Sequence, residues 1–92
     1  MSRVLVVSGR DNVATALEAL RPGQQVEAGG HTIVVQDDVP SGHKVALRRI
    51  TAGEPVLKYG STIGEATADI EQGAHVHVHN VASRRGRGDR RE

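Results

Sequence analysis

The chain has 92 residues, of which 37% are hydrophobic; Tyr59 is its only Phe, Tyr or Trp residue, and it has no cysteine. This length allows one domain, and the lack of cysteine excludes disulfides and thiol-ligated metal centres. The formal net charge of +1 combines an arginine-rich tail over residues 82–92, at +3, with a body at −2. A mildly acidic body is a poor nucleic-acid platform, and the N-terminal apolar run is too short for a signal peptide or membrane span. We therefore expect a cytoplasmic protein with no nucleic-acid or membrane partner.

The N-terminal third predicts one strand and one helix. Val4–Val7 is a short aliphatic run bounded by Ser8 and Gly9, which is typical of a buried strand. Asp11 suits a helix N-cap, and Arg21-Pro22-Gly23 suits a helix end. The apolar residues between them recur at helical spacing, at Val13, Ala14, Ala16, Leu17 and Leu20. We expect a single short helix here.

Beyond residue 24 the apolar pattern changes to the period of two that strands have. Residues 25–28 and 32–35 flank Gly29-Gly30, which predicts a β-hairpin. Four more strands are predicted, at residues 43–50, 56–59, 63–68 with a glycine kink, and 75–81. No internal repeat is evident. The pattern predicts a compact, mainly β domain over residues 1–81. Residues 82–92 form a tail that is flexible, or ordered only against another chain.

Three alternating histidines, in the stretch His75-Val76-His77-Val78-His79-Asn80, are the strongest functional signal. Side chains alternate along a strand, so both valines should face the core and all three histidines the opposite side. Neighbouring histidines would then lie about 6.6–6.8 Å apart and the outer two about 13 Å apart. That spacing allows at most a two-histidine metal site, or imidazoles that bind an anionic substrate directly. An ordinary solvated strand face is an equally weighted alternative.

Two further pairs place cations where a strand meets a loop. His43-Lys44 follows Ser41-Gly42, and Lys58-Tyr59 precedes Gly60. Binding groups often occupy such junctions, and ammonium and hydroxyl groups suit a carboxylate ligand. Taken singly, each lysine is more simply interpreted as an ordinary solvated side chain.

Four segments together resemble the N-terminal domain of the altronate and galactarate dehydratase family: residues 11–17, 42–47, 53–64 and 75–80. That module is similar to the SAF domain, which has a β-clip fold, so the resemblance implies a β-clip with short strands. In the family the module is either fused to a large catalytic domain or made as a separate subunit, as in the alpha subunit of sulfolactate sulfo-lyase. The family also implies a divalent metal, Fe2+ or Mn2+, in the complete enzyme.

The resemblance implies the small, accessory subunit of a carbon–oxygen lyase that dehydrates a sugar acid such as altronate or galactarate. The chain would form one wall of an active site shared with a large catalytic subunit, on which the tail would dock, and would not be catalytic alone. The alternatives are the alpha subunit of a sulfolactate sulfo-lyase and a free-standing carbohydrate- or metal-binding module; a homo-oligomer stays open. His77 is the expected catalytic residue, and His77 and His79 are the expected metal ligands. The expected substrate-binding residues are His43, Lys44, Lys58, Tyr59, His75 and Asn80.

Overall fold

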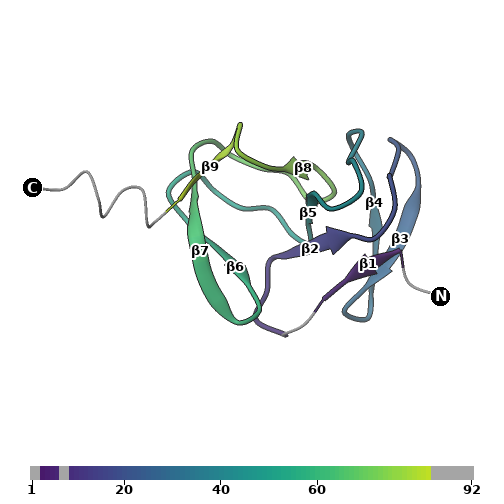
Figure 1. Cartoon of the computed structure of the whole chain (residues 1–92), viewed down its shortest axis with the longest axis horizontal. Helices are drawn as coiled ribbons and strands as arrows, with labels where there is room; N and C mark the ends of the chain where they lie inside the picture. The colour runs from purple at the N-terminus through teal and green to yellow at the C-terminus, as the bar shows by residue number, and fades with distance from the viewer. Residues whose placement is uncertain (1–2, 7–8, 84–92) are drawn as a thin grey trace, which may run out of the picture.

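The computed structural model describes residues 3–6 and 9–83, and this part of the chain contains nine short strands and no helix (Figure 1). The strands are β1 (Val4–Leu5), β2 (Val13–Ala16), β3 (Gln25–Ala28), β4 (His31–Val34), β5 (Lys44–Ala46), β6 (Pro55–Lys58), β7 (Ser61–Ala66), β8 (His75–Val76) and β9 (Val81–Ser83). All pairings are antiparallel, in three sheets ordered β1-β2-β5-β8, β3-β4 and β6-β7-β9. The expectation of a mainly β domain is confirmed. No helix in the described ranges is long and apolar enough to cross a membrane.

The helix expected near the N-terminus is wrong, because Val13–Ala16 form strand β2 between β1 and β5. Both faces of this central strand are covered: Val13 belongs to one core cluster and Ala14 to the other. A strand buried on both faces has consecutive apolar residues, and here they imitate helical spacing. Asp11 caps no helix. Its carboxylate instead accepts hydrogen bonds from the backbone N–H groups of Tyr59 and Gly60, at 3.0 and 2.7 Å.

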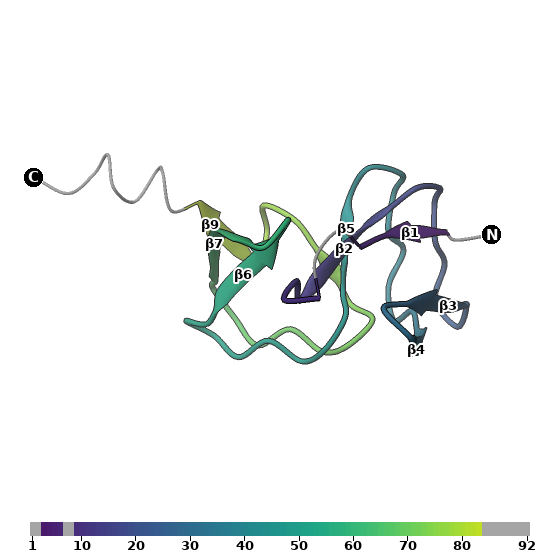
Figure 2. The same ribbon diagram turned by 90° about the horizontal axis from the view of Figure 1, so that it is seen from below.

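The four-stranded sheet lies between the other two sheets. Figures 1 and 2 both show the β3–β4 hairpin on one side of it and β6, β7 and β9 on the other. Ala14 and Val45 point into the cluster under β3–β4, whereas Val13, Ala46 and Val76 point into the cluster under β6–β7. Because side chains alternate along each strand, the middle sheet supplies residues to both cores.

The backbone repeats itself, although the sequence alone gave no sign of a repeat. An isolated antiparallel β-bridge joins Leu20 to Val39, and an equivalent β-bridge joins Ile50 to Ile70 in the second half. The repeat extends to turn glycines: Gly23 and Gly53 both have φ 91°, and Gly42 and Gly73 both have φ 87°. Their hydrogen bonds match too, since Gly23 and Gly53 donate to Val35 and Ala66, while Gly42 and Gly73 donate to Ala16 and Ala46. The two halves are thus one motif used twice, with one hairpin over each face of the middle sheet.

Two of the predicted strands, those expected over residues 43–50 and 75–81, are shorter than expected, whereas β6 and β7 keep the expected lengths. β5 ends at Ala46, and the strand expected over residues 75–81 is divided into β8 and β9. The expected glycine kink is a β-bulge opposite Val56 and Leu57, next to Gly64, where a Cβ atom would collide with the carbonyl oxygen of Ala82. β9 pairs with β7, so the folded domain includes residues 82 and 83. The rest of the predicted tail lies outside the described residues.

Candidate functional site

A tight turn over residues 77–80 interrupts the histidine segment. Asn80 closes it: its side-chain Oδ1 accepts a hydrogen bond from the His77 N–H at 3.0 Å, and its Nδ2 donates to the His75 carbonyl at 2.9 Å. The strand therefore stops at Val76, and Val78 is 81% exposed instead of facing the core. The expected regular alternation through this segment is wrong beyond Val76. Direct substrate binding by Asn80 stays a prediction, beside this structural role.

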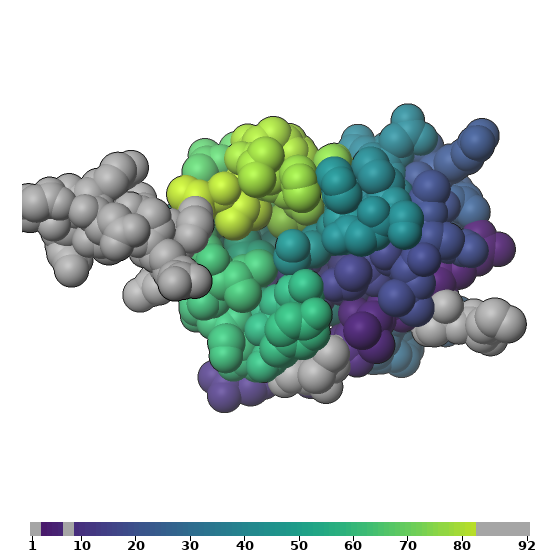
Figure 3. All heavy atoms as spheres, viewed as in Figure 1, coloured from purple at the N-terminus to yellow at the C-terminus, as the bar shows by residue number. Residues whose placement is uncertain are grey.

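Three histidines meet at the end of the β5–β8 pair. Lys44 lies opposite Val76 and Val45 opposite His75, so one further step of the same register brings His43 opposite His77. Their rings stack with centroids 3.8 Å apart, and His43 Nδ1 lies 2.8 Å from His75 Nε2. One ring nitrogen from each of the three lies within 4.8 Å of the others. The space-filling view shows the yellow-green segment after residue 74 against the teal segment around residue 43 (Figure 3).

His79 lies beside this group. Its ring centroid is 4.9 Å from that of His75, at an angle of 35°. The rings of the outer histidines therefore lie beside each other, because the turn bends the backbone between them, whereas an extended strand would separate their backbones by about 13 Å. The trio with mutually close nitrogens consists of His43, His75 and His77 and does not include His79. The expectation that His77 and His79 are the metal ligands came from the spacing within one strand, which carries no information about His43.

The surroundings favour neutral imidazoles. Burial is the largest cause that lowers the pKa of His75, followed by the neighbouring His79, while Asp37 acts in the opposite sense. Desolvation is likewise the first cause that lowers the pKa of His77, followed by His43 and Lys44. A neutral imidazole can accept a proton or coordinate a metal, whereas a protonated one can do neither.

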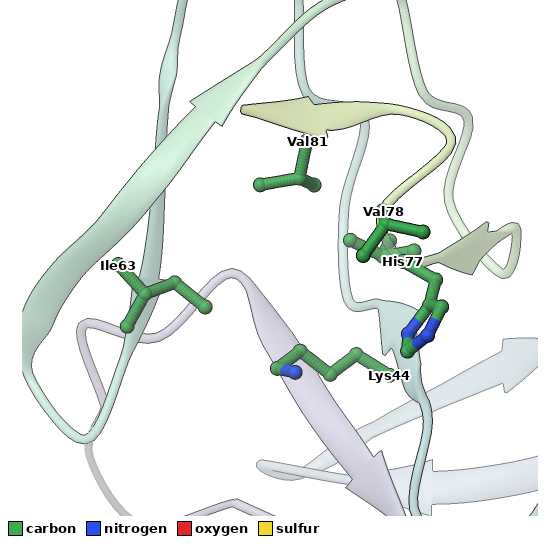
Figure 4. Close-up of a pocket in the computed structure, with 6 residues that line it drawn as sticks. Lys44, Ile63, His77, Val78 and Val81 are labelled. Carbon is green, nitrogen blue, oxygen red and sulfur yellow. The ribbon is translucent and has the colours of Figure 1, made fainter. Parts of the chain in front are cut away.

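A hollow of about 170 Å³ adjoins the histidines (Figure 4). Its lining residues are Lys44, Ile63, Val76, His77, Val78 and Val81. Figure 4 shows the Lys44 amine between Ile63 and His77, with Val81 on the opposite wall. Burial is the main cause that lowers the pKa of Lys44, and the charge of Lys58 is the second. His77 lines this hollow and also belongs to the histidine trio, so the two features form one continuous site.

Most of the expected site residues come together here. The histidines and Lys44 are in direct proximity, and Lys58 and Tyr59 adjoin them through their electrostatic effect on Lys44. The Lys58 Nζ lies 4.5 Å from the centre of the Tyr59 ring. Sequence reasoning missed the apolar walls, Ile63 and Val81. The trio depends on the antiparallel register of β5 with β8, which places Lys44 opposite Val76 and which no local signal in the sequence indicates.

Comparison with known proteins identifies the family. The family described as "Altronate/galactarate dehydratase SAF domain" matches residues 2–84. The chain belongs to this family. The SAF domain is 41% identical over 81 residues to an altronate dehydratase of Bacillus subtilis, which covers 88% of the chain. It is 50% identical over 71 residues to an altronate dehydratase of Escherichia coli, which covers 77% of the chain. The resemblance seen in the sequence is thus confirmed.

The SAF domain spans only a small part of these two relatives, 16% and 14% of their lengths. It spans far more of a third relative, the (2R)-sulfolactate sulfo-lyase subunit alpha of Paracoccus pantotrophus. The two are 45% identical over 53 residues, which is 58% of this chain and 79% of that subunit. The SAF domain is therefore a lyase-associated domain, related both to a part of a large dehydratase and to a small sulfo-lyase subunit.

Proposed function

We propose that this SAF domain is the small, accessory part of a carbon–oxygen lyase that dehydrates a sugar acid such as altronate or galactarate. The observation that carries the proposal is the grouping of His43, His75 and His77 beside Lys44 at one edge of the domain. The adjoining hollow of about 170 Å³ is small against the ~300–1,000 Å³ of ordinary ligand pockets. A large catalytic chain would have to complete the cleft. The proposal includes a β-clip fold, which the resemblance to the family implies, and a cytoplasmic location, which is the expectation from the sequence.

The chemistry of dehydration fits these side chains. A proton next to the substrate carboxylate must leave, and a β-hydroxyl must be expelled with the help of an acid. His77 would transfer a proton in its neutral form, which its environment favours. Lys44 and Lys58 would attract the carboxylate and offset the negative charge that builds up on it. His43, His75 and the Tyr59 hydroxyl would donate hydrogen bonds to substrate oxygens.

The divalent metal implied by the family fits the histidine trio. The ring nitrogens of His43, His75 and His77 lie within 4.8 Å of one another, and neutral imidazole is a good ligand for Fe2+, whereas Mn2+ prefers carboxylates. His43, His75 and His77 would hold the ion, with His79, which the sequence pairs with His77, beside them. Coordination uses the lone pair with which His77 would accept a proton, so if His77 transfers the proton, the ion would be held by His43 and His75. A bound Fe2+ would supply Lewis-acid stabilisation of the enolised carboxylate.

Metal binding can be measured without activity. We expect anaerobic calorimetric titration of the isolated chain with FeCl2 to give one site, and titration with MnCl2 to give weaker binding, as the Irving–Williams order requires. His43→Ala should weaken Fe2+ binding at least tenfold. His31→Ala is the matched control, because His31 is exposed at the start of β4, on the β3–β4 hairpin. Equal affinity in the two variants would contradict the assignment of the trio.

Activity tests the proposal as a whole. The chain should form a stable complex with the large catalytic chain of a lyase from its own organism, and altronate or galactarate dehydration should require both chains. In that complex, His77→Ala should lower kcat by about 100-fold or more, as the loss of a general acid–base group does, while His31→Ala keeps it. Wild-type turnover in His77→Ala, or dehydration by the large chain alone at full rate, contradicts the proposal. A chain that binds sugar acids or metal and joins no large chain would be a free-standing module.

The alpha subunit of a sulfolactate sulfo-lyase is the second candidate. The observation in its favour is that the chain spans 79% of the Paracoccus pantotrophus alpha subunit. The same reconstituted complex separates the candidates. Sulfite release from (2R)-sulfolactate, with no dehydration of altronate or galactarate, would select the sulfo-lyase.

A further inference from the structure

The two repeated halves differ where the pocket lies. Most buried residues of the first half have apolar counterparts in the second: Leu20 and Ile50, Val26 and Val56, Val39 and Ile70, Val45 and Val76. Two buried alanines of the first half, Ala14 and Ala28, are replaced by lysines. Ala14 lies opposite Val45 as Lys44 lies opposite Val76. Ala28 ends β3 as Lys58 ends β6, just before equivalent turns.

The wall of the pocket departs from the repeat in the same place. Ile33 is fully buried in the first half and pairs with Val26. Its counterpart Ile63 falls at the β-bulge, has no strand partner and is partly exposed in the pocket. The core under the β3–β4 hairpin is therefore closed and apolar. The equivalent place under β6–β7 is an open pocket that the Lys44 ammonium lines.

Lys44 has a charge without an internal counter-ion. Within residues 3–6 and 9–83, the ion pairs join arginines to carboxylates and include neither Lys44 nor Lys58. A partly buried ammonium loses hydration, and an anion that enters the pocket would restore its electrostatic stabilisation. Apart from Lys44, His77 is the only lining residue with a polar side-chain atom; Ile63, Val76, Val78 and Val81 offer hydrocarbon alone.

We propose that this pocket binds a small aliphatic carboxylic acid. The carboxylate pairs with Lys44 Nζ, with Lys58 adding to the positive potential, and the alkyl group packs on Ile63, Val76 and Val81. An apolar cavity of about 150 Å³ can hold benzene, so the hollow of about 170 Å³ suits an acid of about four to six carbons. Hydroxyl groups on those carbons would find few partners, and buried unpaired hydroxyls are costly. In the isolated chain the preferred ligand thus differs from the polyhydroxylated substrate of the proposed lyase. Both acids would pair with Lys44 and would compete for it in a complete enzyme, so this inference is tested on the isolated chain and the proposed function on the complex with the large chain.

Methyl-detected NMR titration of the full chain with 3-methylbutanoate tests this inference. Saturable shifts are expected for the methyl groups of Ile63, Val76 and Val81. Gluconate, a hydroxylated acid, and 3-methylbutan-1-ol, a neutral analogue, should each bind at least tenfold more weakly. Lys44→Met, which keeps the aliphatic stem and removes the charge, should weaken 3-methylbutanoate binding at least tenfold. Lys58→Met is the matched control and should have a smaller effect, since Lys58 does not line the pocket.

Three results would overturn the proposal. The first is the absence of saturable shifts at these methyl groups with 3-methylbutanoate. The second is equal binding of the neutral alcohol or of gluconate, which would remove the roles of the charge and of the apolar walls. The third is an equal loss of 3-methylbutanoate affinity in Lys44→Met and Lys58→Met. That result would mean that the acid responds to the overall positive potential and does not pair with Lys44. A retained NMR spectrum of each free variant establishes that it folds, and Val81→Ser, which keeps Lys44, must also weaken binding.

Discussion

At the scale of single residues, Asn12 makes the firmest connection between the middle sheet and the second hairpin. Its side chain is fully buried. The Oδ1 accepts from the Leu57 N–H at 2.7 Å, and the Nδ2 donates to the Pro55 carbonyl at 2.9 Å. The Asn12 backbone N–H also donates to the Leu57 carbonyl, at 3.2 Å, so the residue that precedes β2 is joined to β6 through both its backbone and its side chain. Buried backbone groups need such partners, because unpaired ones destabilise the fold.

Asn12→Ala should therefore lower the free energy of unfolding by about 1–3 kcal/mol, because it leaves two partly buried backbone groups without their side-chain partner. Gln72→Ala is the matched control. It removes a side-chain amide that also donates to a backbone carbonyl, that of Leu47 at 2.9 Å, but on the exposed surface. Its cost should stay within about 0.5–1 kcal/mol. Urea unfolding of both variants measures the difference, and equal costs would contradict the role given to burial.

Two of the clustered histidines, His75 and His77, make stability depend on pH. The pKa values of His75 and His77 are lowered in the folded chain, first by burial and then by neighbouring cationic groups. Above the unfolded-state pKa of about 6.5 both states are neutral, and the full stability is present. As pH falls through that value, the unfolded chain takes up protons first, so stability is lost. The midpoint of urea unfolding should fall between pH 7.5 and 5.5, and less steeply in a His75→Gln/His77→Gln variant; an equal fall would refute this cause.

At the scale of elements, equivalent turns in the two halves give a matched experiment. Gly42 and Gly73 have the same φ of 87°, where a side chain costs about 1–2 kcal/mol. A Cβ at Gly42 meets nothing within 4 Å, whereas one at Gly73 collides with the carbonyl oxygen of Val34. Gly73→Ala should therefore destabilise the fold by about 1–3 kcal/mol more than Gly42→Ala. Thermal unfolding of the two variants checks this, and equal losses would mean that only the backbone conformation matters.

Local and non-local elements differ in how well the sequence predicts them. The β3–β4 hairpin was predictable because its alternating residues and Gly29-Gly30 turn are adjacent in the chain. β2 was not, because burial on both faces depends on β1, β5 and two hairpins distant in sequence. The same holds for the site. Its histidines and lysines were recognised from residue type. The stacking of His43 on His77, however, depends on the register of β5 with β8, and the position at which β8 ends depends on the hydrogen bonds of the Asn80 side chain.

At the scale of the whole molecule, the two halves are not independent domains. The buried residues of the core under β3–β4 all precede position 46, and Leu47 packs against them, whereas the core under β6–β7 also needs Val13 and Ala46 from the first half. Among the described residues, none after Leu47 belongs to the first core. The first half is thus the scaffold on which the second half, and with it the site, is completed.

Two fragments test this dependence. A chain of residues 51–92 lacks Val13 and Ala46 and is too short to bury a core alone, so its NMR spectrum should be that of an unfolded chain. Addition of a fragment of residues 1–50 should restore dispersed signals from residues 55–83. A folded spectrum from residues 51–92 alone would show that the halves do not depend on each other in this way.

The distance of 32 residues between His43 and His75 also sets an order of events during synthesis. A chain is made from its N-terminus, at about 5–20 residues per second, so His43 leaves the ribosome seconds before its partners do. Until β8 has been made and has docked beside β5, the nascent protein offers isolated imidazoles and no trio. Any ion that needs His43, His75 and His77 together therefore cannot bind until β8 lies beside β5.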